Sequence, residues 1–270
     1  MTEYQGDPSL AAYYSDPDLL RQRQGGDAGG SVAAEFADWV VDLIDPGRFS
    51  SVLDAGAGVG RFTTRVAERM KPGTSLVAVD LFAGMVDGLR SIDYPGEVDV
   101  HVVRANIENL PFDDASFDLI MANHVLYHVA TLPIALSRLA GMLTAAGTFL
   151  ATTNADNAVV PILELHRRVC RELGETVTPD VSSFSSENGA DVLRRHFPTV
   201  DAHTFRKPPV PIEPEDLLRG YRSTGRYRLL SQTFSSARVD EVAQRVTDVW
   251  IREDVVILGE VHMSAFVCRK

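Results

Sequence analysis

Short apolar runs and amphipathic segments alternate along the first 153 residues of the chain. The apolar runs suit buried strands, whereas the segments between them carry apolar residues at helical spacing. Strands and helices repeated in this order are typical of an α/β fold with a doubly wound, mostly parallel sheet. The predicted strands cover residues 51–54, 75–79, 98–104, 117–122 and 148–153, and the predicted helices cover 31–44, 61–70 and 133–143. In the first helix, Ser31 is the expected cap, and the apolar stripe is Val32, Phe36, Trp39, Val40, Leu43 and Ile44.

The second half of the chain has a less regular pattern. A turn is predicted at 145–147, before the fifth strand, and the proline-rich stretch 207–214 is expected to form an irregular connection. Insertions at about 154–185 and 207–254 are expected to form a helical cap over the ligand side of the sheet. The predicted elements are helices at 159–173, 186–196, 215–224 and 238–252, a strand at 199–205 and an alternating terminal strand at 261–267.

Residues 1–30 differ in composition from the rest of the chain. Tyrosines precede a glycine-rich stretch, 25–30, whose composition is typical of a flexible hinge. We therefore expect a lid and hinge, with Tyr14 and Arg21 on a bound cofactor and Tyr13 on the substrate; a frayed N-terminus is the alternative. The segment is polar and acidic, so we do not expect a signal peptide.

Composition narrows the class of protein. The chain has 270 residues, 45% of them hydrophobic, which is enough for one core with inserted cap elements. Its formal net charge of -11 disfavours a nucleic-acid or anionic-membrane partner, because both need basic patches. No apolar run reaches the length of a membrane span. The two cysteines, Cys170 and Cys268, are expected to be reduced and buried in a cytoplasmic protein.

The glycine-rich stretch from Asp54 to Gly60 carries the first chemistry. It follows a strand, opens into a helix, and holds glycines at 56, 58 and 60, so the backbone can take positive φ and a ligand can approach closely. A dinucleotide-binding turn reads G-x-G-x-x-G, but Arg61 stands where that pattern needs its last glycine. The carboxylate of Asp54 would also repel a pyrophosphate. A ligand with a positive centre, such as S-adenosylmethionine, suits the stretch better, and a plain tight turn is the alternative.

Polar residues at the ends of the next two strands extend this site. Asp80 ends the second strand 24 residues after Gly56, where its carboxylate can accept hydrogen bonds from both ribose hydroxyls of a nucleoside. Leu81 and Phe82 follow as candidates for an apolar bed under adenine, and an ordinary place in the core is the alternative. After the third strand, the side-chain oxygen of Asn106 and the backbone N–H of Ile107 are expected to contact the adenine ring.

As an ordered set, these motifs resemble the class I S-adenosylmethionine-dependent methyltransferases of the broad ubiquinone-biosynthesis, or type 11, kind. The resemblance implies a Rossmann-like sheet of seven strands with the last one antiparallel, Asp80 on the ribose, residue 106 near the adenine, and S-adenosylhomocysteine as product. Asn106 stands where most relatives carry Asp, and Thr144-Ala145-Ala146-Gly147 replaces a Lys-Pro-Gly-Gly turn. The matching segments are 53–60, Asp80, Asn106 with 110–112, 116–120 and 143–148.

Residues after the fourth strand are the candidates for catalysis. His124 and His128 lie where the transferred methyl group must be, and His is suited to act as a base near neutral pH. A structural or capping role for each is the alternative. Tyr127 is a candidate for substrate contact and Asn123 for cofactor contact. Asn123, Asp156 and Asn157 only loosely match a magnesium site, and the two histidines lack a third zinc ligand, so no metal is expected.

Three classes of function compete. The leading hypothesis is a methyltransferase of residues 31–270 acting on a small molecule through an O, N or C nucleophile, as a monomer or homodimer. A nucleic-acid methyltransferase is disfavoured because Asn123-His124-Val125-Leu126 replaces the Asn-Pro-Pro-aromatic motif after the fourth strand. A non-catalytic S-adenosylmethionine-binding protein is disfavoured because the acidic and glycine positions of the donor site are intact.

Overall fold

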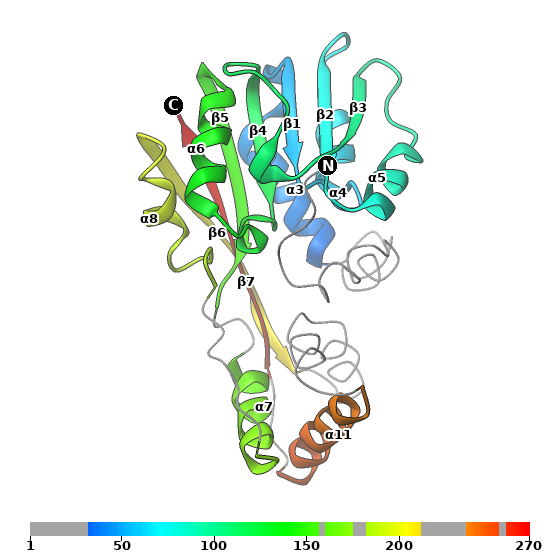
Figure 1. The fold of residues 1–270 in the computed structure, drawn as a ribbon, viewed down its shortest axis with the longest axis vertical. Coiled ribbons are helices and arrows are strands. Elements are labelled where there is room, and N and C mark those ends of the chain that lie inside the picture. The colour runs from blue at the N-terminus through cyan, green and yellow to red at the C-terminus, as the bar shows by residue number, and fades with distance from the viewer. Residues whose placement is uncertain (1–31, 157–159, 175–181, 212–235, 254–257) are drawn as a thin grey trace.

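The computed structural model describes residues 32–156, 160–174, 182–211, 236–253 and 258–270 (Figure 1). Within these ranges, no helix is both long and apolar enough to cross a membrane. The strands are β1 (Ser51–Ala55), β2 (Ser75–Asp80), β3 (Asp99–Arg104), β4 (Phe117–Asn123), β5 (Leu143–Asn154), β6 (Thr199–Pro211) and β7 (Leu258–Arg269). The helices are α3 (Val32–Ile44), α4 (Arg61–Ala67), α5 (Ala83–Arg90), α6 (Leu132–Met142), α7 (Val160–Glu172), α8 (Gly189–Leu193) and α11 (Ser236–Glu253), with 3-10 turns η1 (Pro46–Arg48), η2 (Ile107–Asn109) and η3 (Leu126–His128).

All seven described strands form one sheet, in the order β3-β2-β1-β4-β5-β7-β6. Strand β7 runs antiparallel to both of its neighbours, and the other strand pairs are parallel. This confirms the predicted sheet with its antiparallel last strand. The chain builds outward from β1 to β3 and then returns to place β4 on the other side of β1. In such sheets, ligands bind beyond the carboxyl ends of the strands at this point of reversal.

Helices cover both faces of the sheet. On one face, which we call the α6 face, Leu136 of α6 packs with Phe149 of β5 and Phe266 of β7. On the other, the α3 face, Phe36 and Val40 of α3 pack with residues of α4, α5 and the strands between them. Successive strand residues alternate between the two clusters, as a pleated sheet requires. The prediction of a doubly wound sheet is therefore correct, and residues 264–268 of the terminal strand are buried on both faces.

The apolar stripe of α3 differs in part from its prediction. Val32 is 37% exposed, whereas Ala37 and Val41 are buried beside Phe36, Val40 and Ile44. Because Val32 is the first residue of the described helix, it lies at the end of the stripe and the sheet does not fully bury it. Ser31, the expected cap, lies outside the described residues.

Two connections predicted to be irregular are parts of strands. Residues 145–147 belong to β5, where the pairing with β4 shifts register between Phe117 and Leu119. The expected turn is a bulge in a continuous strand, and Gly147 packs against Leu143 in it. The proline-rich stretch also continues β6 as far as Pro211, with a register shift between Lys207 and Val210. Because β6 is an edge strand, its prolines need not donate to a second neighbour.

Helices α7 and α11 form a separate pair at the far end of the long strands β6 and β7 (Figure 1). The two helices contact each other, and Arg168 donates a 2.7 Å hydrogen bond to Glu253. Val169 and Cys170 of α7 and Val246 and Trp250 of α11 are buried. The two cysteines are buried and form no disulfide. The helices predicted at 159–173 and 238–252 are thus present, whereas the helix predicted at 215–224 lies outside the described residues.

Candidate functional site

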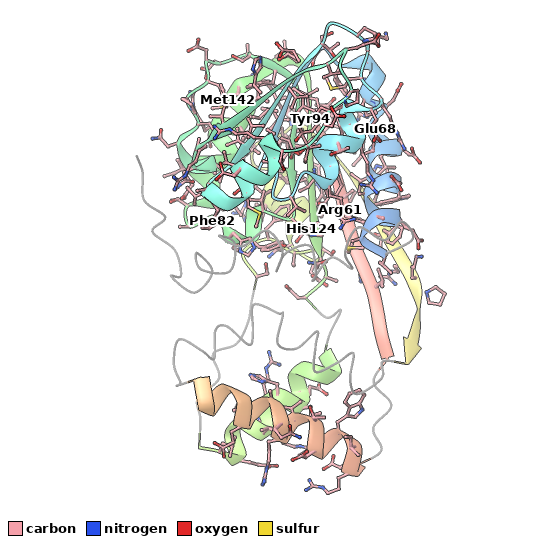
Figure 2. All side chains as sticks on the ribbon, turned by 90° about the vertical axis from the view of Figure 1, so that its right-hand side faces the viewer. Arg61, Glu68, Phe82, Tyr94, His124 and Met142 are labelled. Atoms are coloured by element: carbon pink, nitrogen blue, oxygen red, sulfur yellow. The ribbon has the colours of Figure 1, made fainter. Side chains whose placement is uncertain are left out.

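A cavity of about 310 Å³ lies at the carboxyl ends of β1, β2 and β4. Its walls come from the glycine turn after β1, the residues after β2 and β3, and the segment that leaves β4. Figure 2 shows Phe82, Arg61 and His124, all of which line the cavity, along the border of the sheet layer that faces α7 and α11. No described residue of those two helices lines the cavity. A covering role for them stays a prediction.

The glycine turn is held by contacts with the protein itself. Gly56, Gly58 and Gly60 all have positive φ, of 86°, 57° and 81°. A Cβ on Gly56 would lie 2.5 Å from Cγ2 of Val125, and one on Gly60 would lie 2.6 Å from Cδ1 of Ile92. We expected these glycines to admit a ligand. At positions 56 and 60, neighbouring side chains occupy the space that a Cβ would need. Gly56 also lines the cavity, so its predicted contact with a cofactor stays a prediction.

Asp80 ties the glycine turn to β2. Its Oδ2 accepts a 2.9 Å hydrogen bond from the Gly58 N–H, and its Oδ1 accepts a 3.0 Å bond from the Phe82 N–H. Burial raises the pKa of the Asp80 carboxyl, and the backbone N–H groups of Phe82, Gly58 and Leu81 oppose the rise. A carboxylate has about four acceptor sites on its two oxygens, so it can accept from a ligand beside these backbone donors. The predicted ribose contact remains compatible with this geometry.

Asp54 is buried deeper and is only half satisfied. The Thr63 hydroxyl donates a 2.6 Å hydrogen bond to its Oδ2, and its buried Oδ1 has no partner. Burial raises the pKa of Asp54 to about 7, the Thr63 hydrogen bond opposes the rise, and the charge of Asp80 adds to it. A cationic group at Oδ1 would favour the ionised form. The arrangement fits the positive centre that the sequence predicted.

The candidate adenine contacts lie together on the β2–β3 side of the cavity. Leu81, Asn106 and Ile107 all line it. The Asn106 side-chain oxygen accepts a 2.9 Å hydrogen bond from the Glu108 N–H and so caps η2. Asn106 therefore positions the turn that carries Ile107, and its oxygen has one lone pair left for the predicted contact with adenine.

The segment after β4 brings four predicted residues to the opposite wall: Asn123, His124, Tyr127 and His128. His124 has a φ of 51°, a conformation that costs energy for a residue with a side chain. Its backbone N–H lies 3.1 Å from the Thr152 carbonyl oxygen and 3.2 Å from the Thr152 hydroxyl oxygen. Its ring lies 5.4 Å from that of Phe36, and the His128 ring lies 4.4 Å from that of Tyr127. The roles of both histidines as base stay predictions.

Some cavity residues were absent from the sequence-based site. Phe36 of α3, Phe62 of α4 and Met263 of β7 form an apolar part of the wall, beside Arg61 and Asn154. Phe36 belonged to the predicted core stripe, and helical spacing does not tell which core residue ends at a cavity. Met263 reaches the site because β7 pairs with β5 so that Met263 lies opposite Asn154.

The predicted lid contacts Tyr13, Tyr14 and Arg21 lie outside the described residues, as does Asn157. Within the part of the chain that the structure describes, no group of three His, Cys, Asp or Glu side chains is placed to hold a metal ion.

Comparison with known proteins assigns the domain. Residues 53–151 match the family described as "Methyltransferase domain". The chain is 32% identical over 123 residues to malonyl-[acyl-carrier protein] O-methyltransferase of Salmonella typhimurium, a match covering 46% of each chain. It is 26% identical over 141 residues to the ubiquinone/menaquinone biosynthesis C-methyltransferase UbiE of Pasteurella multocida, covering 49% of this chain and 52% of the relative. The chain thus spans about half the length of these relatives.

A solved structure has a similar fold. It is a Haemonchus contortus phosphoethanolamine N-methyltransferase in complex with phosphomonomethylethanolamine and S-adenosylhomocysteine, with a TM-score of 0.57 and 14% identity. The match covers 100% of this chain and 61% of that one. The family match and the two relatives confirm the resemblance expected from the sequence motifs.

Proposed function

We propose that this chain, whose residues 53–151 form a class I S-adenosylmethionine-dependent methyltransferase domain, transfers the donor's methyl group to a small-molecule acceptor. The observation that carries the proposal is the half-satisfied carboxyl of Asp54 in the wall of the cavity. An unpartnered, buried carboxylate oxygen is costly, and a cationic ligand group would offset that cost. S-adenosylmethionine carries such a group in its α-ammonium.

The chain's residues fit the other parts of the donor as well. The Asp80 carboxylate can accept from the ribose hydroxyls beside its backbone donors, and Leu81 and Ile107 offer apolar surface to the adenine ring. Gly56 and Gly58 lie in the turn between the carboxylates of Asp54 and Asp80. When bound, S-adenosylmethionine supplies an electrophilic methyl group on a sulfonium centre.

The residues of the chain act mainly by positioning. A methyl transfer needs the nucleophile in line with the carbon–sulfur bond and water kept out, and a rigid wall favours both. Phe36 and Met263 give the cavity an apolar side, and the constrained backbone of His124 holds its ring against Phe36. A proton leaving an O, N or C nucleophile could be accepted by His124 or His128, since both line the cavity.

A small acceptor is supported over a nucleic acid by the net charge of -11 and by the absence of the Asn-Pro-Pro motif after β4. One relative is named as an O-methyltransferase of malonyl-[acyl-carrier protein] and the other as a C-methyltransferase of ubiquinone/menaquinone biosynthesis. These names do not agree on one kind of nucleophile, so the proposal includes O, N and C acceptors. We further propose that the protein acts in the cytoplasm, as a monomer or a homodimer.

Calorimetry with S-adenosylhomocysteine tests the donor site. The wild-type chain should bind it, and Asp80→Ala should weaken binding at least tenfold because the ribose and the Gly58 N–H both lose their acceptor. If the wild type fails to bind, or Asp80→Ala binds equally well, the donor assignment is wrong.

Transfer itself is tested with S-adenosylmethionine labelled in the methyl group and a panel of phenols, amines, carboxylic acids and acidic carbon compounds. Appearance of label in one class, with release of S-adenosylhomocysteine, would identify the acceptor. If one histidine acts as the general base, its replacement in His124→Ala or His128→Ala should lower kcat for that acceptor about 100-fold or more at saturating donor. Wild-type kcat in both variants would leave positioning as the mechanism.

A further inference from the structure

Two residues of the cavity wall carry buried polar atoms without a partner. They are Oδ1 of Asp54, an acceptor, and Nδ2 of Asn123, a donor. Asp54 is 1% exposed and Asn123 is 7% exposed. The other unpartnered buried side-chain atoms among the described residues belong to Tyr94, Arg168 and Ser186, which do not line the cavity. Buried polar groups are normally hydrogen-bonded, so these two point to a ligand that supplies both partners.

A threonine holds the second polar atom of each residue. Thr63 donates to Oδ2 of Asp54 at 2.6 Å, and the Thr152 hydroxyl donates to Oδ1 of Asn123 at 3.2 Å. Thr152 lies opposite Asn123 in the register of β5 and β4. Its hydroxyl oxygen also receives the backbone N–H of His124 at 3.2 Å. One hydroxyl therefore holds two consecutive residues of the cavity wall.

These contacts determine which way the Asn123 amide points. With the carbonyl oxygen toward Thr152, the hydroxyl proton has an acceptor and the amide N–H groups face away from Thr152. The reverse orientation would exchange one unpartnered amide atom for the other and would also leave the hydroxyl proton without this acceptor. The hydrogen-bond network thus selects the orientation with Nδ2 as the group available to a ligand.

Asp54, Asn123 and Thr152 lie on adjacent strands and on the α3 face. Val52, Met121 and Leu150 pack on the α3 face and precede Asp54, Asn123 and Thr152, respectively, by two residues. Residues two apart in a strand point to the same face of the sheet. Asp54 pairs with Met121, so Asn123 lies one strand across and two residues further along. Neighbouring strands are about 4.8 Å apart and rise about 3.3 Å per residue, which places the two Cα atoms about 8 Å apart.

An anionic acceptor and a neutral donor at this spacing match the two ends of an α-amino acid. The ammonium suits Asp54, and the carboxylate suits the amide N–H groups of Asn123, because hydrogen bonds to a charged group are the stronger kind. A nucleoside without an amino-acid group would leave both buried atoms unsatisfied. The pair therefore selects for the amino-acid end of the ligand.

We propose that Asn123 Nδ2 donates a hydrogen bond to the α-carboxylate of the methyl donor, and that Thr152 is the positioning residue that orients this amide. The inference rests on the proposed function, since it assumes that the donor binds in this cavity. It adds to that function a means of distinguishing the intact donor from nucleosides that lack the carboxylate.

Three probes separate the groups of the donor. S-adenosylhomocysteine has both the ammonium and the carboxylate, its decarboxylated analogue keeps only the ammonium, and 5′-methylthioadenosine has neither. Asn123→Ala should lower the affinity for S-adenosylhomocysteine about tenfold, the effect of one hydrogen bond to a charged group. It should leave the affinity for the other two probes within about twofold.

Thr152 has matched variants. Thr152→Val removes the hydroxyl at nearly constant volume and should lower the affinity for S-adenosylhomocysteine about threefold to fivefold, less than the loss of the amide itself. Thr152→Ser should restore it. Thr153→Val is the control, because Thr153 is the next buried residue of β5 but donates to the Phe184 carbonyl oxygen. Thr153→Val should leave the ratio of the affinities for S-adenosylhomocysteine and its decarboxylated analogue unchanged, even if the melting temperature of the variant falls.

Several outcomes would overturn the inference. Equal losses for all three probes in Asn123→Ala would make Asn123 a structural residue. An unchanged affinity for S-adenosylhomocysteine would show that its amide does not contact the donor. A wild-type chain that binds none of the probes would instead refute the proposed function, so the two failures are distinguishable. Melting temperatures of the variants identify any that fail to fold.

Discussion

Asp54 and Asp80 stand at the carboxyl ends of neighbouring strands and are both buried, but their surroundings differ. Backbone N–H groups of Gly58 and Phe82 satisfy one lone pair on each Asp80 oxygen. Asp54 has only the Thr63 hydroxyl, on one oxygen. The Asp80 side of the cavity is thus held by the protein alone, whereas the Asp54 side has an unmet polar group. The difference indicates that Asp80 is first a support of the turn, and that Asp54 depends more on the ligand.

Gly56→Ala should have the largest effect, because it forces the two sides of the cavity apart. The new Cβ would lie 2.5 Å from Cγ2 of Val125, at a φ of 86° that disfavours any side chain. We expect a loss of more than about 3 kcal/mol in the free energy of unfolding, measured with urea. Gly73→Ala is the control, since Gly73 also has positive φ but has open space around its Cβ position. It should cost only about 1 kcal/mol, and equal losses would contradict the packing argument.

Asp54→Asn should show the energetic cost of the half-satisfied carboxyl. The folded-state pKa of about 7 lies above the ordinary value of 3.8, so the protonated form is favoured in the folded chain. The stability contributed by this group is therefore fully present below about pH 4 and is lost as pH rises through about 7.

The amide of the variant cannot ionise, so it avoids the cost of a buried charge. The variant should therefore be more stable than the wild type from pH 5 to pH 8. The gain should be at most roughly 4 kcal/mol. Urea unfolding at several pH values measures this difference. A difference that does not change with pH would mean that Asp54 ionises without a cost from burial.

Asp80→Asn should behave in the opposite way. An amide has one acceptor oxygen, so one of the two backbone N–H groups of Gly58 and Phe82 would lose its partner. We expect a destabilisation of about 2 kcal/mol in urea unfolding at pH 8, where Asp54→Asn is stabilising. Variants that shift in the same direction at pH 8 would remove the distinction between the two carboxylates.

The smallest predicted effect is a pH dependence of ligand binding. Below pH 7, an ammonium group must first displace the proton of Asp54, whereas above pH 7 it meets the ionised carboxylate. The affinity for S-adenosylhomocysteine should therefore rise about tenfold between pH 6 and pH 8. Calorimetry across this range in Asp54→Asn should give a flat profile; an equally steep profile there would assign the proton to another group.

The sequence predicted the core of the fold well, because its signals are local. The alternation of strands and helices, the glycine turn after β1 and the spacing from Gly56 to Asp80 can all be read within a few tens of residues. The errors arose where local signals depend on neighbouring strands. Prolines of 207–211 indicated a loop, but an edge strand accommodates them, and residues 145–147 indicated a turn, but pairing with β4 makes them a bulge.

By itself, the sequence determined the class of the domain, the order of its elements and the position of Asp54 and Asp80 at two strand ends. Only the tertiary structure decided which atoms of those residues remain without a partner. The contact of Thr152 with Asn123 spans 29 residues, and that of Val125 with Gly56 spans 69. Such contacts depend on strand register and on the return of the chain from β3 to β4, which no local pattern specifies. The chemistry of the cavity follows from these distant pairings.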